Sequence, residues 1–197
     1  STAELFSNDP AKAKAILAAE GYPDGMDIEL VIRTDPEFRD IGELLAAQWS
    51  KIGVKTNLKT LEVTLHDNMR GTHDYEDGFL WETGAASLPG HASVGLFTPD
   101  GSRRYNMADW NNPDYSARYL AAESEMDPPT MEAMVKELSV DLVDAAPFLP
   151  LGSPYQLSMT WPWVKNYFGE IEAGFIDYGP MVMRMWIDQD LKKSMGF

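Results

Sequence analysis

The sequence predicts an α/β fold, because strand and helix patterns alternate along its first third. Apolar residues at every second position over 26–32 predict a strand with one buried face. Apolar residues at helical spacing over 38–52 predict a helix that closes on Gly53. A second alternation over 54–63 predicts another strand. A strand, a helix and a strand in this order favour a right-handed crossover and a parallel pair.

A helix is predicted before the first strand, with a signal at each end. Asp9 is a suitable N-cap, Pro10 suits the first turn, and 11–20 consists of strong helix formers. Gly21 can adopt the left-handed conformation that ends a helix.

The rest of the chain continues the mixture of helices and strands. We expect a short helix over 64–69 with Thr64 as its cap and Gly71 as its end, then a short buried strand over 77–83. Small residues over 84–90 predict a loop, and 98–112 is mostly irregular. Further helices are expected over 113–125 and 129–145, and strands over 147–151 and 155–160. The second of these helices has an apolar face formed by Met131, Met134, Val135, Leu138 and Leu142.

Composition excludes several function classes. The 197 residues include 16 basic and 31 acidic ones, a formal charge of -15 that repels nucleic acid and anionic lipid. There is no cysteine, hence no disulfide, thiolate metal site or cysteine nucleophile. No apolar run approaches the roughly 20 residues that span a bilayer, and the N-terminus lacks a signal-peptide pattern.

Four stretches, in this order and spacing, resemble the carboxyl-terminal lobe of bacterial extracellular solute-binding proteins of family 5, the dipeptide and oligopeptide class of ABC importers. The first runs from Asp9-Pro10-Ala11-Lys12-Ala13-Lys14 to Ala19-Glu20-Gly21-Tyr22-Pro23-Asp24-Gly25. The second comprises Arg39-Asp40-Ile41, Leu45, Gln48 and Lys51-Ile52-Gly53-Val54. The third comprises Asn106, Trp110, Asn112-Pro113 and Tyr115, and the fourth is Asp144-Ala145-Ala146-Pro147-Phe148-Leu149-Pro150-Leu151.

The resemblance implies one lobe of a two-lobed, class II periplasmic-binding-protein-like fold, with a mixed sheet flanked by helices. Such a protein encloses a small solute or peptide between its lobes and delivers it to an ABC permease, without catalysis and without a cofactor or metal. We therefore expect a periplasmic or extracytoplasmic full-length protein, with a signal peptide and an N-terminal lobe upstream of this fragment.

Two domains are expected on this basis. Residues 1–160 would form the ligand-binding lobe, and 161–197 an aromatic-rich tail. The tail would pack on this lobe or cross to the missing N-terminal lobe. In the second case the isolated fragment exposes apolar surface and self-associates.

The family resemblance also places a ligand site. Family members have a strand ending in Gly-Trp, followed within a few residues by an aspartate that pairs with a peptide's amino terminus. Here the matching strand ends in Leu80-Trp81-Glu82, and no aspartate follows before Pro89. Glu82 is the nearest carboxylate, but regular alternation turns it to the face opposite Trp81. Peptides, opines, oligosaccharides and other small solutes all stay open as ligands.

The candidate ligand contacts are Trp81, as a stacking platform, and the residues after it. The Thr83, Gly84, Ala85 and Ala86 backbone offers hydrogen bonds, His91 a polar contact and Arg103 a partner for an anionic group, with Glu82, Tyr105 and Trp110 as further candidates. Each has a structural alternative. Trp81 and the other aromatics are equally typical of a core, His91 of a surface histidine at a helix start, and Arg103 of a partner for nearby carboxylates.

Two other function classes remain open from the residues alone. His66, Asp67, His73, Asp74 and Asp77 are metal-ligand types, but their spacing matches no metal motif and favours a solvated face. A hydrolase using a carboxylate pair among Asp74, Asp77 and Glu82 is one alternative to binding. A protein-interaction module that uses the aromatic tail is the other.

Overall fold

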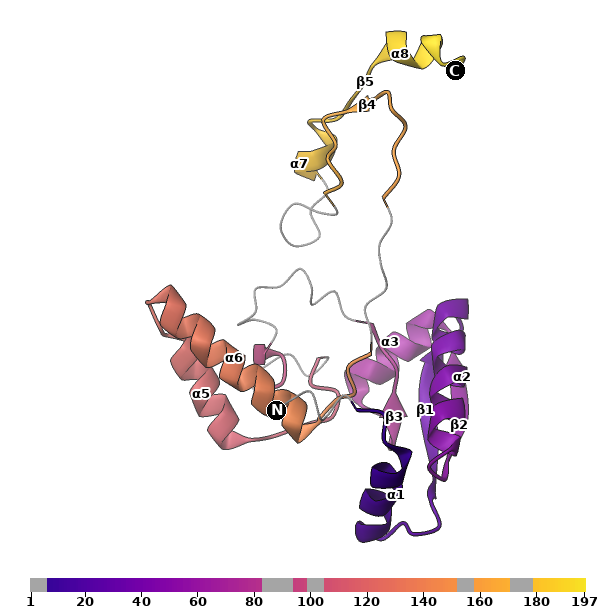
Figure 1. Cartoon of the computed structure of the whole chain (residues 1–197), viewed down its shortest axis with the longest axis vertical. Helices are drawn as coiled ribbons and strands as arrows, with labels where there is room; N and C mark the ends of the chain where they lie inside the picture. Colours follow the sequence, from indigo (N-terminus) through magenta and orange to yellow (C-terminus); the bar gives the residue numbers. More distant parts are fainter. Residues whose placement is uncertain (1–6, 83–93, 99–104, 152–157, 171–178) are drawn as a thin grey trace. The chain divides into compact units, whose positions relative to one another are not determined.

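The computed structural model describes residues 7–82, 94–98, 105–151, 158–170 and 179–197, which fall into two compact units (Figure 1). The first unit contains the described residues from 7 to 148, and the second contains those from 149 to 197. Among the described residues, no helix is long and apolar enough to cross a membrane.

A parallel three-stranded sheet lies at the centre of the first unit. Its middle strand is β1 (Met26–Arg33), with β2 (Val54–Leu61) on one side and β3 (Gly78–Phe79) on the other. Met26 lies opposite Val54, and Leu30 opposite Gly78. The predicted α/β class and the parallel β1–β2 pair are confirmed. The strand expected over 77–83 is shorter than predicted, because only two of its residues pair with β1.

The first helix forms as its end signals predict. Helix α1 (Pro10–Ala19) is capped by Asp9, whose carboxylate accepts hydrogen bonds from the backbone N–H groups of Ala11 and Lys12 at 3.1 and 2.9 Å. Gly21 has a φ of 97°, the left-handed conformation expected where the helix stops.

Helices α2 (Pro36–Ser50) and α3 (Val63–Thr72) pack on the sheet. Helix α2 places Gly42 against the side chains of Ile32 and Leu58, and Phe38 joins the same core with Leu30, Ile32 and Leu80. Helix α3 places His66 against Phe79 of β3. Because neighbouring residues on a strand point to opposite faces, the two helices cover opposite faces of the sheet.

The predicted boundaries of α3 were wrong at both ends. Its cap is Glu62, whose carboxylate accepts the Thr64 N–H at 3.1 Å, so Thr64 lies inside the first turn. The helix continues past Gly71 to Thr72, and His73 ends it with a φ of 58°. Glutamate is not among the preferred N-cap residues, so the cap preferences of the sequence favoured Thr64 over the residue that caps the helix in the structure.

A second core forms between α5 (Pro113–Glu123) and α6 (Pro128–Ala145). Leu138 and Leu142 of α6 are buried here, as the predicted apolar face requires. Tyr115 of α5 is also buried, and its hydroxyl donates a hydrogen bond to the Val94 carbonyl at 3.0 Å. Burial raises the pKa of Tyr115 to about 12.

The strand predicted over 147–151 is absent, since this segment has no strand pairing in the structure. Pro147 and Pro150 lack the N–H groups that a ladder needs, so apolar alternation alone was misleading. Of the strand predicted over 155–160, only 158–160 is described, and it is also irregular.

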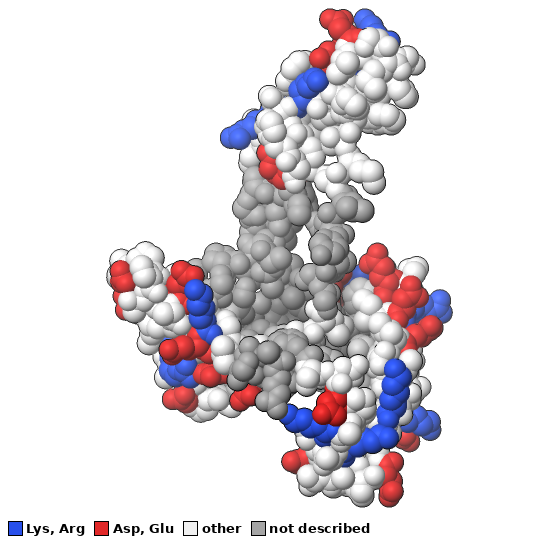
Figure 2. Space-filling model, in the orientation of Figure 1, with Lys and Arg blue, Asp and Glu red and all other residues white. Residues whose placement is uncertain are grey.

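The second unit is small and largely exposed. Strands β4 (Val164–Lys165) and β5 (Trp186–Ile187) pair antiparallel, and the unit also contains α7 (Gly179–Val182) and α8 (Gln189–Ser194). Buried Trp163 stacks on Trp161 at 4.6 Å between ring centroids, and Phe197 packs against both. Uncharged residues make up most of the surface that this unit presents in Figure 2.

We predict that Gly25→Ala destabilises the chain far more than Gly21→Ala, although both glycines have positive φ. A Cβ on Gly25 overlaps the Gly53 carbonyl oxygen where β1 and β2 begin, whereas a Cβ on Gly21 meets nothing within 4 Å. Chemical denaturation should show a loss of more than about 2 kcal/mol for Gly25→Ala and about 1 kcal/mol for Gly21→Ala. Equal losses would contradict the close approach of the two glycines.

Candidate functional site

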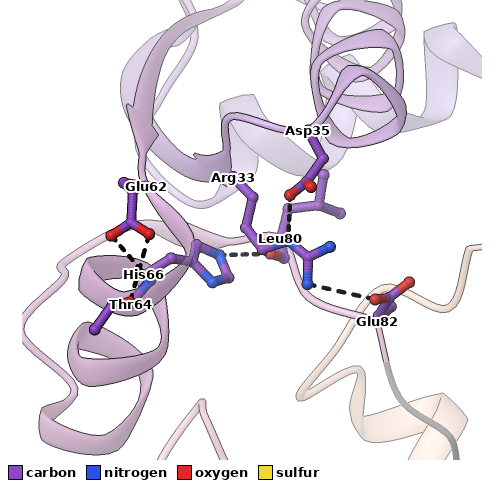
Figure 3. A network of polar contacts seen from close by, with 7 residues as sticks. All are labelled: Arg33, Asp35, Glu62, Thr64, His66, Leu80 and Glu82. Atoms are coloured by element: carbon purple, nitrogen blue, oxygen red, sulfur yellow. Dashed lines mark hydrogen bonds and ion pairs between the residues drawn. The ribbon is translucent and has the colours of Figure 1, made fainter.

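A network of polar contacts lies where β1 and the chain after β3 leave the sheet (Figure 3). Arg33, the last residue of β1, donates from Nε to Asp35 Oδ2 at 2.6 Å and from Nη1 to Glu82 Oε1 at 3.4 Å. Its guanidinium also lies 4.1 Å from the ring centroid of Phe38. The carboxyl edge of parallel strands is where sites form in α/β sheets, so this edge is the candidate site.

Trp81 is held between residues from two other segments. The guanidinium of Arg70, on α3, lies 4.2 Å from the Trp81 ring, a cation–π contact. The ring of Tyr105 meets Trp81 edge-on, with centroids 5.5 Å apart. Because Arg70 covers one face of the indole, a flat ligand can stack on Trp81 only from the opposite face.

Below this edge, His66 of α3 is completely buried. Its Nε2 lies 3.0 Å from the carbonyl oxygen of Leu80, the residue that immediately precedes Trp81. The imidazole lies on Phe79, with ring centroids 4.2 Å apart, and meets the edge of Phe38. Burial is the largest influence on this imidazole and lowers its pKa, so His66 is neutral at pH 7.

The structure brings together three of the residues predicted as ligand contacts, namely Trp81, Glu82 and Tyr105. Trp110 instead packs edge-on against Tyr115 beside the second core, and its backbone N–H donates to Asn106 Oδ1. It lines a separate hollow of about 250 Å³ between α5 and α6. The remaining predicted contacts, Thr83, Gly84, Ala85, Ala86, His91 and Arg103, lie outside the described residues.

Sequence reasoning missed Arg33 and Arg70 as members of this site. Arg33 had a usable signal, because it ends a predicted strand whose carboxyl end faces the site edge. Arg70 had none, because one arginine on a short helix is indistinguishable from a solvated residue until α3 is placed against the chain that follows β3.

His73 and Asp77, two residues of the metal and hydrolase alternatives, make structural contacts. Asp77 accepts the Glu29 N–H at 2.7 Å, and His73 Nδ1 lies 3.0 Å from Asp109 Oδ2, so these side chains have separate structural partners. Within the described ranges, no group of three or more His, Asp or Glu side chains is arranged to hold a metal ion.

We predict that Arg33→Ala destabilises the chain and Glu82→Ala does not. Arg33 pairs with Asp35 and covers Phe38, so its loss should cost about 1–2 kcal/mol. The Glu82 side chain is 66% exposed and its ion pair is long, so its removal should change the free energy of unfolding by less than about 0.5 kcal/mol. Denaturant titration of both variants tests this, and a large loss for Glu82→Ala would give Glu82 a structural role instead.

The chain is similar in sequence to known bacterial proteins. Residues 1–105, more than half of the chain, match the family model described as bacterial extracellular solute-binding proteins, family 5, middle. Heme-binding protein A of Haemophilus influenzae is 30% identical over 167 residues, 82% of this chain and 30% of that protein. The dipeptide-binding protein of Escherichia coli is 26% identical, over 82% of this chain and 31% of its own length. The chain thus spans about a third of the length of these relatives.

Solved structures share the fold. The periplasmic binding protein DppA from Helicobacter pylori, solved with the peptide STSA, superposes with a TM-score of 0.74 at 19% identity, covering 92% of this chain and 35% of that one. The murein tripeptide binding protein MppA of Escherichia coli gives a TM-score of 0.65 at 24% identity, covering 80% and 31%. The expected periplasmic-binding-protein-like lobe is confirmed, and the chain belongs to family 5 of the bacterial extracellular solute-binding proteins.

Proposed function

We propose that this chain forms the carboxyl-terminal lobe of a substrate-binding component of an ABC importer, and that the edge around Trp81 is its half of the ligand site. The observation that carries the proposal is that Trp81 and Glu82 directly follow β3 at the carboxyl edge of the sheet, in a chain that belongs to a solute-binding family. Capture by two lobes needs contacts that form only when they close, and one lobe supplies part of them.

The chemistry of this edge suits a solute with a flat or apolar part and a polar group. Arg70 occupies one face of the Trp81 indole, so a stacking ligand would need the other face. Glu82 is largely exposed and only loosely tied to Arg33, so it can exchange that partner for a ligand cation or hydrogen-bond donor. Because breaking the weak ion pair between Glu82 and Arg33 costs little free energy, Glu82 can form a new contact when ligand binds.

The ligand class is proposed as a peptide or another small solute. Relatives are named for dipeptides and for heme, which differ widely in shape. The aspartate expected from the family resemblance is missing between Trp81 and Pro89, which weighs against recognition of a peptide's amino terminus. Heme and dipeptides are therefore the first two probes.

A non-catalytic role fits the described carboxylates. Asp77 accepts a hydrogen bond from the Glu29 backbone and Glu82 pairs with Arg33, so both carboxylates have structural partners. We therefore propose capture and delivery, with no reaction at this site.

The proposed partners are the N-terminal lobe of the same protein and an ABC permease, in the periplasm or outside the cell. The exposed apolar residues of the second unit suit a lobe that covers them; they include Met159, Trp161, Phe168, Val182, Met183, Trp186 and Phe197. Without that lobe, the same surface would favour self-association of the fragment.

We predict that the full-length protein binds its solute tightly and that this chain alone binds it at least about 100-fold more weakly, because half the contacts are missing. Calorimetry with dipeptides and with heme measures both. In the full-length protein, Trp81→Ala should weaken binding about tenfold, the loss expected for one aromatic contact, while Trp110→Phe should leave the affinity unchanged. Tight stoichiometric binding by the isolated chain, or no effect of Trp81→Ala, would refute the proposal.

A second prediction concerns the apolar surface. Sedimentation of this chain should show concentration-dependent association, which Phe168→Ser with Met183→Ser reduces. These side chains are 84% and 88% exposed; Met126, 91% exposed in the first unit, provides the control as Met126→Ser. A strictly monomeric wild-type chain would show that its apolar tail needs no cover.

A further inference from the structure

We infer that His66 is a positioning residue for the site at Trp81: its Nε2–H group holds the Leu80 carbonyl and thereby fixes where Trp81 and Glu82 leave the sheet. The inference rests on the proposed function only in calling that edge a ligand site. The contacts that carry it belong to the first unit alone.

The hydrogen bond determines the tautomer of His66. A carbonyl oxygen can only accept, so the Nε2 atom 3.0 Å from Leu80 must carry the proton. The Nδ1 atom is then a bare lone pair, and it is buried with no hydrogen-bond partner among the described residues. A buried polar atom without a partner is costly, so its retention suggests that the bond made by Nε2 is needed.

The Leu80 carbonyl lies immediately after β3, where pairing with β1 ends. Strand β3 pairs with β1 only through Gly78 and Phe79, and the Leu80 N–H donates to the Val31 carbonyl at 2.9 Å. Trp81 and Glu82, which follow, are held through their side chains, Trp81 by Arg70 and Tyr105 and Glu82 by Arg33. The His66 hydrogen bond therefore holds the backbone immediately before both site residues.

The surroundings of His66 make this anchor sensitive to protonation. Phe38 of α2 and Phe79 of β3 contact the ring, and neither stabilises a charge on it as a carboxylate would. The Leu80 carbonyl and Asp67 of α3 favour a positive charge there, whereas burial, the largest influence, and Arg33 of β1 and Arg70 of α3 oppose it. A proton on Nδ1 would thus be buried without an acceptor among the described residues.

The direction of the pH effect follows from the folded-state pKa, which lies below the ordinary value of 6.5. Above 6.5 His66 is neutral in both folded and unfolded chains, and its full contribution is present. As the pH falls below 6.5 the unfolded chain takes up a proton first, so the free energy of unfolding decreases toward the lower folded-state pKa. Local opening at Leu80 should become more frequent in the same range.

The test uses the whole chain labelled with 5-fluorotryptophan, with the Trp81 fluorine signal assigned by Trp81→Phe, and with ¹⁵N-histidine. At pH 7.5 the His66 ring should show the Nε2–H tautomer. As the pH is lowered to 5, the Trp81 signal should shift at the pH where the His66 ring takes up its proton. If that pH lies below 5 in the folded chain, the Trp81 signal should broaden as the pH approaches 5. The other tautomer at pH 7.5 would overturn the inference.

Two variants separate positioning from mere packing. His66→Gln places an amide N–H near the Nε2 position and cannot be protonated, so its Trp81 signal should stay near the wild-type position and not change with pH. His66→Asn places its amide near Nδ1, too far to reach Leu80, so its signal should be displaced already at pH 7.5. Hydrogen exchange at Leu80 and Trp81 should be about fivefold faster in His66→Asn than in His66→Gln, the change expected for one hydrogen bond.

The matched control is His73→Gln at the C-cap of the same helix. His73 contacts Asp109 and Tyr75 rather than Leu80, so this variant should keep the wild-type pH response of Trp81. Identical Trp81 signals in His66→Asn and wild type, or loss of the response in His73→Gln, would overturn the inference. No ligand enters these measurements, so a full-length protein that binds solute without Trp81 would overturn the proposed function and leave the positioning role intact.

Discussion

The first unit depends on the parallel pairing of β1 with β2 and β3. Leu30, Val31 and Ile32 are all buried, so β1 is covered on both faces, as a central parallel strand must be. Each buried side chain of this size contributes about 1.5–3 kcal/mol. The pairing also positions the site residues, because it brings Arg33, at the end of β1, next to the chain that continues from β3 into Trp81 and Glu82.

Positions at this edge differ in how firmly they are held. Arg33 is fixed by Asp35 and by the ring of Phe38, and Trp81 is fixed by Arg70. Glu82 is the exception, since it is exposed and has one long ion pair. A firm aromatic surface beside an adjustable carboxylate is an arrangement that can gain contacts when a second lobe closes over a solute, while the buried sheet stays unchanged.

Much of the fold could be predicted because local signals and tertiary packing agree. Asp9, Pro10 and Gly21 define α1 by themselves, and alternation over 26–32 predicts β1, although its last part is buried on both faces rather than on the one face expected. Prediction failed where two signals competed or where pairing was required. Thr64 is a preferred cap residue, yet Glu62 caps α3, and 147–151 alternates like a strand without having a partner. Trp81, Glu82 and Tyr105 were predicted as site candidates, whereas the role of Arg70 depends on how α3 packs, which no local pattern encodes.

The central claim is that the chain from Leu80 to Glu82 forms part of the ligand site of a two-lobed protein. The most direct test is hydrogen exchange of the full-length protein with and without a bound solute, resolved to the peptide covering 78–82. We expect slower exchange in this peptide on binding, with little change in β1, which is already buried. Ligand binding that leaves the exchange of 78–82 unaltered would contradict it.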